Sequence, residues 1–360
     1  MVKLGEVCEI KYGKALKKEA RVPGDVQVFG SSGVIGSHVT PNFDGPVCVI
    51  GRKGSAGQVS WSEKSCWVID TAFAAMPLSD ETDSRWLFYM LRTLDLAKLE
   101  KHAAVPGISK SDLVQESIPL PPLDEQKRIA KVLGEIAFAI ELVSKQIGAV
   151  DESLRVGLWN VSEEGESVSL SHYVQKITSG KSLKEGDSDD CRNAVLKISA
   201  VTSGYFDEAE TKPLPNSYIP SVLHRANCGD ILLSRANTTE LVGACAIVET
   251  SKANLYLPDK LWKLHINEGV NEYFFWHLLQ TRGVRSRISK ASSGSGGSMK
   301  NISQKAFLGI SVPNFSDETQ LRVGNLVVEK RRLRQLLHQK LALLQELQRS
   351  LSARAFEGSL

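Results

Sequence analysis

A regular hydrophobic pattern runs through the middle of the chain. Between residues 118 and 154, the proline-rich tract IPLPP gives way to apolar side chains that recur at intervals of 4, 3, 4, 3, 4, 3 and 4 residues. The apolar positions are Ile129, Leu133, Ile136, Ile140, Val143, Ile147, Val150 and Leu154. A period of about 3.5 residues predicts a helix whose narrow apolar seam packs against another helix. We expect this helix to begin at Leu123 or Asp124, and the prolines to form a stiff hinge before it.

A second helix with a less regular seam is predicted towards the end of the sequence. Its apolar positions are Val323, Val327, Leu333, Leu337, Leu341, Leu344, Leu347 and Leu351. Lys330 interrupts this seam, and its register slips between residues 344 and 347. Because a two-per-heptad seam is narrower than a helix needs on its own globular domain, pairing of the two helices is favoured over that simpler packing. We expect the pair to be antiparallel.

The chain also contains an internal repeat. A shift of 194 positions aligns residues 108–131 with 302–325 without a gap, including a shared Gln126/Gln320. Further corresponding segments are 4–17 with 170–184, 47–57 with 230–244, and 86–93 with 273–281. A repeat of this length indicates two copies of one module, related by an internal pseudo-twofold.

Each copy begins with a globular part that contains short β-type runs and turns rich in glycine and proline. Amphipathic helices are predicted near 85–101 and 271–290. The expected fold class is therefore α+β, with a mixed or antiparallel sheet in each of two similar domains and an antiparallel coiled coil of two long helices. The expected division is a first globular domain (1–122), a first helix (123–160), a second globular domain (161–315) and a second helix (316–360).

The amino-acid composition excludes some classes of protein but does not identify a function. The chain has 42% hydrophobic and 24% charged residues and a net charge of +3, which is typical of a globular protein and too weak to indicate nucleic acid by itself. No signal-like segment or membrane-length apolar run is evident, so we expect a cytoplasmic protein that binds no membrane. The six cysteines are scattered, which favours buried thiols in a reducing compartment over disulfides or zinc.

Motifs for catalysis are missing from the sequence. PPL at 121–123 lacks the preceding acidic or amide residue of a methyltransferase NPPY or DPPF motif, and GRKGSAG at 51–57 lacks the GK[ST] of a phosphate-binding loop. The histidines form no HExxH. We expect no active site and no cofactor bound by this chain.

Three features together resemble a known family. SIPLPPLDEQKRIAKVL (117–133), the paired helix after it and LQRSLSARAFEGSL (347–360) resemble the DNA-specificity subunit of type I restriction–modification enzymes. The resemblance covers essentially the whole chain, and GRKGSAG and ISKSDL (108–113) also fit it. The second copy departs from the pattern, because PNFSDETQ (313–320) lacks the double proline and has Thr319 before the glutamine.

The resemblance implies a division of labour. Each globular part would be a target-recognition domain that reads one half of a split double-stranded DNA target, and the helices would hold the two readers apart. Two methyltransferase subunits would bind the helices and supply S-adenosylmethionine and catalysis. Two motor-nuclease subunits can join them to cut unmodified DNA.

Candidate DNA contacts are donor-rich turns, because base edges and phosphates are read by such side chains. In the first copy they are Lys14, Lys17, Arg52, Lys53, Ser55 and Lys110, with His102 in a neighbouring loop. In the second copy they are Lys181, Arg235, Asn237, Thr238, Arg285, Arg287, Lys300 and Asn301. Ordinary solvated surface is the alternative for each residue. For the whole chain, the alternatives are a self-sufficient DNA methyltransferase and a coiled-coil scaffold that binds no DNA.

Overall fold

The computed structural model of the protein describes residues 1–100, 107–156, 166–181, 192–250, 252, 254–294 and 299–356. The chain divides into two compact units. The first comprises Met1–Ser144 with Gln339–Leu360, and the second comprises Lys145–His338. Each unit therefore holds one globular part and a portion of both long helices.

The sheets of the first unit follow a simple order. A four-stranded antiparallel sheet runs β2 (Cys8–Tyr12), β8 (Ala72–Pro77), β5 (Val47–Gly51), β6 (Val59–Ser62). A three-stranded mixed sheet runs β4 (Gly33–His38), β3 (Val26–Gly30), β7 (Trp67–Val68), with β3 and β7 parallel. A short antiparallel pair joins β1 (Val2–Lys3) to β9 (Ser117–Ile118).

The second unit repeats these three sheets with the same order and directions. Its four-stranded sheet runs β11 (Val174–Ser179), β18 (Leu261–Ile266), β14 (Ile231–Ser234), β16 (Cys245–Ile247). Its mixed sheet runs β13 (Thr211–Pro213), β12 (Ala194–Leu196), β17 (Leu255–Tyr256), with β12 and β17 parallel. The short pair is β10 (Ser167–Ser169) with β20 (Ser311–Pro313), and a further pair, β15 (Ala236–Asn237) with β19 (Lys300–Asn301), is added. The predicted duplication of an α+β module is confirmed.

The helices repeat as well. The first unit contains α1 (Leu4–Val7), α2 (Ser84–Thr93), α3 (Lys110–Leu113) and the 3-10 turns Lys18–Ala20 and Leu96–Leu99. The second unit contains α5 (Glu272–Gln280), α6 (Arg282–Ala291), α7 (Gln304–Leu308) and the 3-10 turns Leu170–His172, Ile198–Val201 and Val222–His224. The long helices are α4 (Leu123–Val156) and α8 (Asp317–Phe356).

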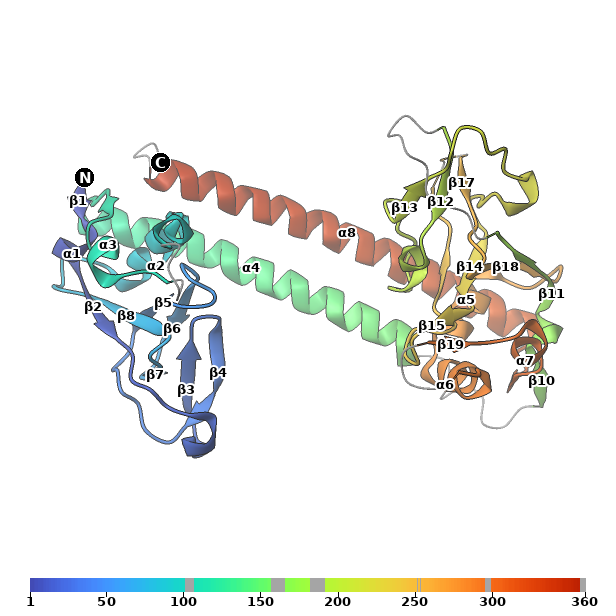
Figure 1. The fold of residues 1–360 in the computed structure, drawn as a ribbon, viewed down its shortest axis with the longest axis horizontal. Helices are drawn as coiled ribbons and strands as arrows, with labels where there is room; N and C mark the ends of the chain where they lie inside the picture. Colours follow the sequence, from blue (N-terminus) through green and yellow to red (C-terminus); the bar gives the residue numbers. More distant parts are fainter. Residues whose placement is uncertain are drawn as a thin grey trace. The chain divides into compact units, whose positions relative to one another are not determined.

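Corresponding side chains cap corresponding helices. The Asp83 carboxylate accepts the Trp86 backbone N–H at the start of α2 (2.7 Å), and the Asn271 side chain accepts that of Phe274 at the start of α5 (2.9 Å). Each cap satisfies a backbone donor that the first turn of a helix leaves unpaired. The caps fix α2 and α5 on the four-stranded sheets, which they cover in each unit (Figure 1).

Two predicted helices were too long. The helix expected near 85–101 ends at Thr93, and the one expected near 271–290 is broken into α5 and α6 at Thr281. In both places the threonine hydroxyl donates to the carbonyl three residues earlier, at 2.7 Å from Met90 O and from Leu278 O. The residue that follows each α-helix, Leu94 or Thr281, then has an extended backbone. A side chain that bonds the local backbone competes with helix continuation.

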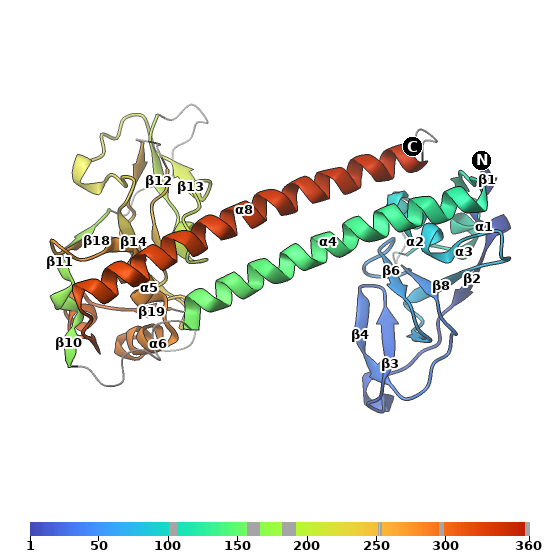
Figure 2. The ribbon, with the colours of Figure 1, turned by 180° about the vertical axis from the view of Figure 1, so that it is seen from behind.

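The seam predicted for α4 is confirmed, since six of its eight positions are buried and the helix begins at Leu123 as expected. In the first unit, Ala355 from the end of α8 belongs to the same core as Ile129 and Leu133 from the start of α4. In the second unit, Leu154 from the end of α4 shares a core with Val327 near the start of α8. The helices thus pair antiparallel within each unit (Figure 1, Figure 2).

The seam predicted for α8 was partly wrong. Among the less exposed positions of α8, an unbroken alternation of four and three is formed by Val323, Val327, Lys330, Arg334, Leu337, Leu341, Leu344, Gln348, Leu351 and Ala355. Leu333 (48% exposed) and Leu347 (46% exposed) lie outside it. Lys330 does not interrupt the seam, because long basic side chains can bury their stems while their charged heads reach polar partners. The Arg334 Nε atom lies 2.7 Å from an Asp151 carboxylate oxygen, and Lys330 Nζ donates to the Ser153 carbonyl at 3.4 Å.

The cysteine prediction held for most residues described. Cys8, Cys48, Cys66 and Cys245 are buried free thiols, and burial raises the pKa of Cys8 to about 12. Cys228 is exposed, contrary to expectation, and Cys191 lies outside the described residues. Of the helices described, none has the length and apolar character needed to cross a bilayer.

Candidate nucleic-acid interface

The turn after strand β5 forms the first candidate surface. The Gly51 N–H donates to the Gln58 carbonyl (2.8 Å), and the Gly57 N–H donates to the Gly51 carbonyl (2.9 Å). A side chain at Gly51 would lie 2.2 Å from the Ser55 carbonyl oxygen, and Gly57 has a φ of +82°. Both positions therefore require glycine. The closed turn presents Arg52 directly at the end of a buried strand.

The Arg52 side chain is held at the surface by its neighbours. Its Nη1 atom donates to the Asp70 carbonyl at 3.2 Å, and the guanidinium carbon lies 5.0 Å from the Tyr12 ring centroid and 5.9 Å from that of Phe73. Its backbone N–H donates to the Thr71 carbonyl at 2.9 Å. A cation over an aromatic face is stabilised by the ring quadrupole. The guanidinium is thereby oriented beside Tyr12, which is 52% exposed.

Lys14 follows strand β2, and its backbone contacts strand β7 of the three-stranded sheet. Its backbone N–H donates to the Val68 carbonyl, and its own carbonyl accepts from the Trp67 indole, both at 2.9 Å, while its side chain is exposed. Among the other residues predicted for this copy, Lys17 and Ser55 are exposed and Lys53 and Lys110 are half-buried. His102 lies outside the described residues.

Arg235 occupies the corresponding place in the second copy. Its Nε atom donates to the Asp259 carbonyl at 2.8 Å, and its backbone N–H donates to the Lys260 carbonyl at 3.0 Å. Arg52 and Arg235 thus each donate one side-chain and one backbone hydrogen bond to carbonyls just before the neighbouring strand, which is β8 for Arg52 and β18 for Arg235. The repeat therefore preserves an arginine, its orientation towards one carbonyl and its backbone anchor.

A second loop docks on each arginine. The Ile108 N–H donates to the Arg52 carbonyl, and the Ile302 N–H donates to the Arg235 carbonyl, both at 2.9 Å. In the second copy this loop also pairs with the residues after Arg235, because Asn237 lies opposite Lys300 in the β15–β19 ladder. The Arg235 Nη1 atom donates to the Asn301 side-chain oxygen at 3.1 Å.

The structure thus brings together four of the residues predicted for the second copy, namely Arg235, Asn237, Lys300 and Asn301. The Thr238 N–H donates to the Asn237 side-chain oxygen at 2.9 Å, so this asparagine also orders its own turn. Lys181 is exposed and follows Gly180, where a side chain would lie 2.0 Å from the Leu257 carbonyl oxygen.

Two predicted contacts of helix α6 hold the fold instead of standing free. The Arg285 Nη2 atom donates to the Glu240 carbonyl at 2.8 Å, and burial lowers the pKa of its guanidinium. The Arg287 Nη1 atom donates to the Ser311 carbonyl. Contact of either residue with DNA stays a prediction.

Sequence reasoning missed Tyr12 and the two aspartates whose carbonyls orient the arginines. Tyr12 directly precedes the glycine of KYGK, and Asp70 and Asp259 each stand two residues before the strand that pairs with the arginine's strand. An exposed aromatic next to a basic turn was the available signal for Tyr12. For the aspartates no side-chain signal existed, because their backbone carbonyls make the contact.

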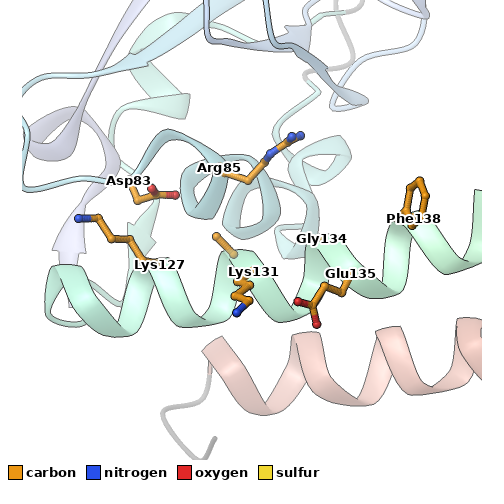
Figure 3. Close-up of a pocket in the computed structure, with 8 residues that line it drawn as sticks. Asp83, Arg85, Lys127, Lys131, Gly134, Glu135 and Phe138 are labelled. Carbon is orange, nitrogen blue, oxygen red and sulfur yellow. The ribbon is translucent and has the colours of Figure 1, made fainter.

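A recess lies elsewhere in the first unit, beside the start of α2. It has a volume of about 460 Å³, and we call it the α2–α4 recess. Figure 3 shows Asp83 just before α2 and Arg85 on its first turn, with Lys127 and Phe138 projecting from α4 on the same side. Phe138 is 67% exposed, and Gly134 lies between these side chains along the helix. In the described ranges, no group of three or more His, Cys, Asp and Glu side chains is placed to hold a metal ion.

Comparison with known proteins identifies relatives of this chain. Residues 1–151 match the sequence profile of the type I restriction modification DNA specificity domain. The chain is 25% identical over 292 residues to the type I restriction enzyme EcoKI specificity subunit of Escherichia coli K12, covering 74% of this chain and 62% of that protein. It is 37% identical over 112 residues to the EcoEI specificity subunit of Escherichia coli, covering 31% of this chain and 19% of that protein.

A solved structure extends the comparison along the chain. The S subunit of a type I restriction-modification system from M. genitalium has a TM-score of 0.60 and 18% identity, covering 98% of this chain and 95% of that one. At that identity the likeness concerns the fold. The chain spans less than two thirds of the length of the two curated relatives. Residues 1–151 thus match the DNA specificity domain of type I restriction–modification systems, and the full length of the chain shares the fold of a solved S subunit.

Proposed function

We propose that this chain is a non-catalytic subunit that recognises a bipartite double-stranded DNA target. In this proposal residues 1–122 and 161–315 are the two target-recognition domains, and residues 123–160 and 316–360 are the helical regions that connect them. The observation that carries it is the duplicated arginine turn. Arg52 and Arg235 follow equivalent strands and make equivalent backbone and side-chain contacts.

The chemistry of these turns suits direct readout of DNA. Arginine donates two parallel hydrogen bonds to the O6 and N7 atoms of guanine, and asparagine pairs similarly with adenine. Exposed lysines such as Lys14 and Lys181 suit phosphates, which position a protein on DNA without specifying sequence. Each unit holds one such set, so each would read one half of the target.

The proposed partners are two methyltransferase subunits and, for restriction, two motor-nuclease subunits. S-adenosylmethionine would bind the methyltransferases. The long helices leave large apolar side chains uncovered, among them Phe138 (67% exposed), Leu142 (48%) and Leu343 (67%). Phe138 and Leu142 are neighbours on one face of α4, because they stand four residues apart. Adjacent exposed apolar side chains typically mark protein interaction surfaces, which supports helix-mediated assembly.

Methylome sequencing tests the proposal directly. Cells that carry this chain together with its proposed methyltransferase partner should show a methylated motif of two short halves separated by unspecified bases. An unsplit motif that this chain methylates alone would instead establish the self-sufficient methyltransferase. No motif and no DNA binding in the assembled complex would favour the scaffold.

Two variants sharpen the test, each serving as the control for the other. Arg52→Ala should relax the sequence requirement in one half of the motif only, and Arg235→Ala in the other half only. Loss of a bidentate arginine–guanine contact costs about 1–3 kcal/mol of discrimination. If both variants retain the unaltered motif, these arginines do not read bases.

A further inference from the structure

A larger recess lies in the second unit, where α8 passes the globular part. Its volume is about 840 Å³, and we call it the α8 recess. Helix α8 contributes Arg331, Arg332 and His338 to one wall, while Tyr273 and Glu249 stand on the globular wall. Polar and aromatic side chains converge on a concave surface here, which is the usual form of a binding site.

Positive charge dominates this recess. The Arg331 side chain is 7% exposed, with Nη2 2.6 Å from the Glu249 carboxylate and the guanidinium carbon 4.5 Å from the Trp276 ring centroid. Its Nε and Nη1 atoms have no hydrogen-bond partner among the residues that the structure describes. Arg332 and His338 are exposed and form no ion pair with any described residue. Glu249 can balance one guanidinium, so the recess keeps an excess of cationic donors.

The internal repeat shows that both copies have a recess at this position beside the long helix, but that only the second copy lines it mainly with basic side chains. The shift of 194 positions relates Arg332 to Phe138 and Val328 to Gly134, which line the α2–α4 recess of the first unit. That recess mixes signs, with two carboxylates among its basic side chains (Figure 3). A recess beside the helix therefore belongs to the module, whereas the cationic lining belongs to the second copy.

The shape of the α8 recess favours a protein segment over duplex DNA. Phosphates on a duplex lie on a convex surface and contact side chains that project from the protein. Arg331 is buried, and Tyr273 and Val328 add apolar lining. A peptide segment that carries both apolar and acidic side chains can enter such a recess. Its carboxylates would pair well with arginine, because the guanidinium can donate two parallel hydrogen bonds to one carboxylate.

We propose that the α8 recess binds an acidic protein segment, carried by the methyltransferase subunit with which this chain assembles. The inference rests on the proposed function and adds the chemistry of one anchoring point. Arg332 supplies the accessible charge, and Arg331 supplies donors at the inner wall. The first copy, which has Phe138 at the equivalent position, would receive a different part of its partner.

Charge reversal on the full chain tests the inference. Arg332→Glu should weaken assembly with the co-purified methyltransferase by about tenfold, because a like charge replaces an ion pair at the interface. Arg322→Glu is the matched control, since Arg322 is exposed on the same helix and does not line the recess. It should change the dissociation constant less than twofold. Lysine at the contacting acidic position of the methyltransferase should restore assembly with Arg332→Glu.

A photo-crosslinker at Gln335, which also lines the recess, identifies the occupant in the assembled complex. The expected product joins Gln335 to an acidic peptide of the methyltransferase. Unchanged assembly of Arg332→Glu, or weaker binding of a 30-base-pair duplex (a length on the order of three helical turns) with assembly intact, would overturn the inference. In those cases the wild-type complex would still methylate a split motif. Failure of the wild-type chain to assemble or methylate would instead reject the proposed function, and the inference with it.

Discussion

Gln126 is the glutamine of the proline-rich motif, and its structural role allows a quantitative prediction. Its side chain is 1% exposed. The amide nitrogen donates to the Glu81 carbonyl (3.0 Å) and the Pro121 carbonyl (2.9 Å), and the amide oxygen accepts the Asp83 N–H (2.8 Å). One side chain therefore joins the start of α4 to the loop that caps α2.

Its counterpart in the second copy is less well satisfied. The Gln320 amide nitrogen donates to the Phe315 carbonyl at 3.1 Å, but its buried amide oxygen has no hydrogen-bond partner in the described part of the chain. The two glutamines occupy equivalent positions and are similarly buried, at 1% and 4% exposure. Replacing each by leucine therefore compares three hydrogen bonds with one in the same local fold.

The expected costs follow from these contacts. Each net hydrogen bond contributes about 1 kcal/mol, so Gln126→Leu should lower the free energy of unfolding of the first unit by about 3 kcal/mol. Gln320→Leu loses about 1 kcal/mol, and removing an unpaired buried oxygen offsets part of it. We expect a net change below about 1 kcal/mol in the second unit.

Hydrogen exchange detected by mass spectrometry can read the two units separately in the full chain. In Gln126→Leu, the amides of α2 should exchange roughly a hundredfold faster, as a change of about 3 kcal/mol requires. In Gln320→Leu, the amides of α5 should change less than about fivefold. Equal acceleration in the two variants would show that the hydrogen-bond count does not determine the cost.

Three further predictions concern the second unit and α8. Burial and the nearby Lys330 lower the pKa of His277 to about 4. Below pH 6.5 the unfolded chain therefore binds a proton that the folded chain excludes. The free energy of unfolding should fall by about 3 kcal/mol as the pH drops from 6.5 towards 4. Urea unfolding of His277→Gln should show a flatter pH dependence, and an unchanged slope would contradict this cause. A double-mutant cycle with Arg334→Met and Asp151→Asn should give a coupling of about 1–2 kcal/mol, measured by denaturation, whereas additive effects would mean that their 2.7 Å contact contributes nothing. Leu337→Glu, in the seam, should cost at least about 2 kcal/mol, while Leu333→Glu on the exposed flank should cost less than about 0.5 kcal/mol in the same assay. Similar costs for the two variants would return Leu333 to the seam beside Leu337.

The sequence was sufficient where one local pattern decides the structure. The period of α4 alone identified its buried face, because apolar residues occupy the seam without exception. On α8 the same reasoning wrongly selected Leu333 and Leu347. In these stretches polar residues occupy the seam and leucines occupy the exposed flank, so hydrophobicity pointed to the wrong face. Arg334 could not be recognised as a seam residue, because its partner Asp151 lies 183 positions earlier in the chain. Pairing over that distance leaves no local pattern.

The candidate site shows the same division at the level of single atoms. The glycine-rich turn and its arginine were visible in the sequence, because a turn of this kind needs glycine whatever surrounds it. The groups that orient the arginine were not visible, since they are mostly backbone carbonyls of residues just before a neighbouring strand. Any side chain can stand at such a position. Arg52 and Arg235 could therefore be predicted as candidates. The sequence could not show which nitrogen atoms of each guanidinium would donate to a backbone carbonyl of the fold.

Duplication explains why the two copies agree in some contacts and differ in others. Backbone contacts, such as those from Ile108 to Arg52 and from Ile302 to Arg235, depend on topology and survive substitution of most side chains. Side-chain contacts, such as the three hydrogen bonds of Gln126, need specific partners, and Gln320 retains only one of them. A module that keeps its backbone scaffold while its side chains diverge can present the same arginine turn twice in different surroundings. Under the proposed function, the two halves of one target would then differ in sequence while the two recognition domains share a single fold.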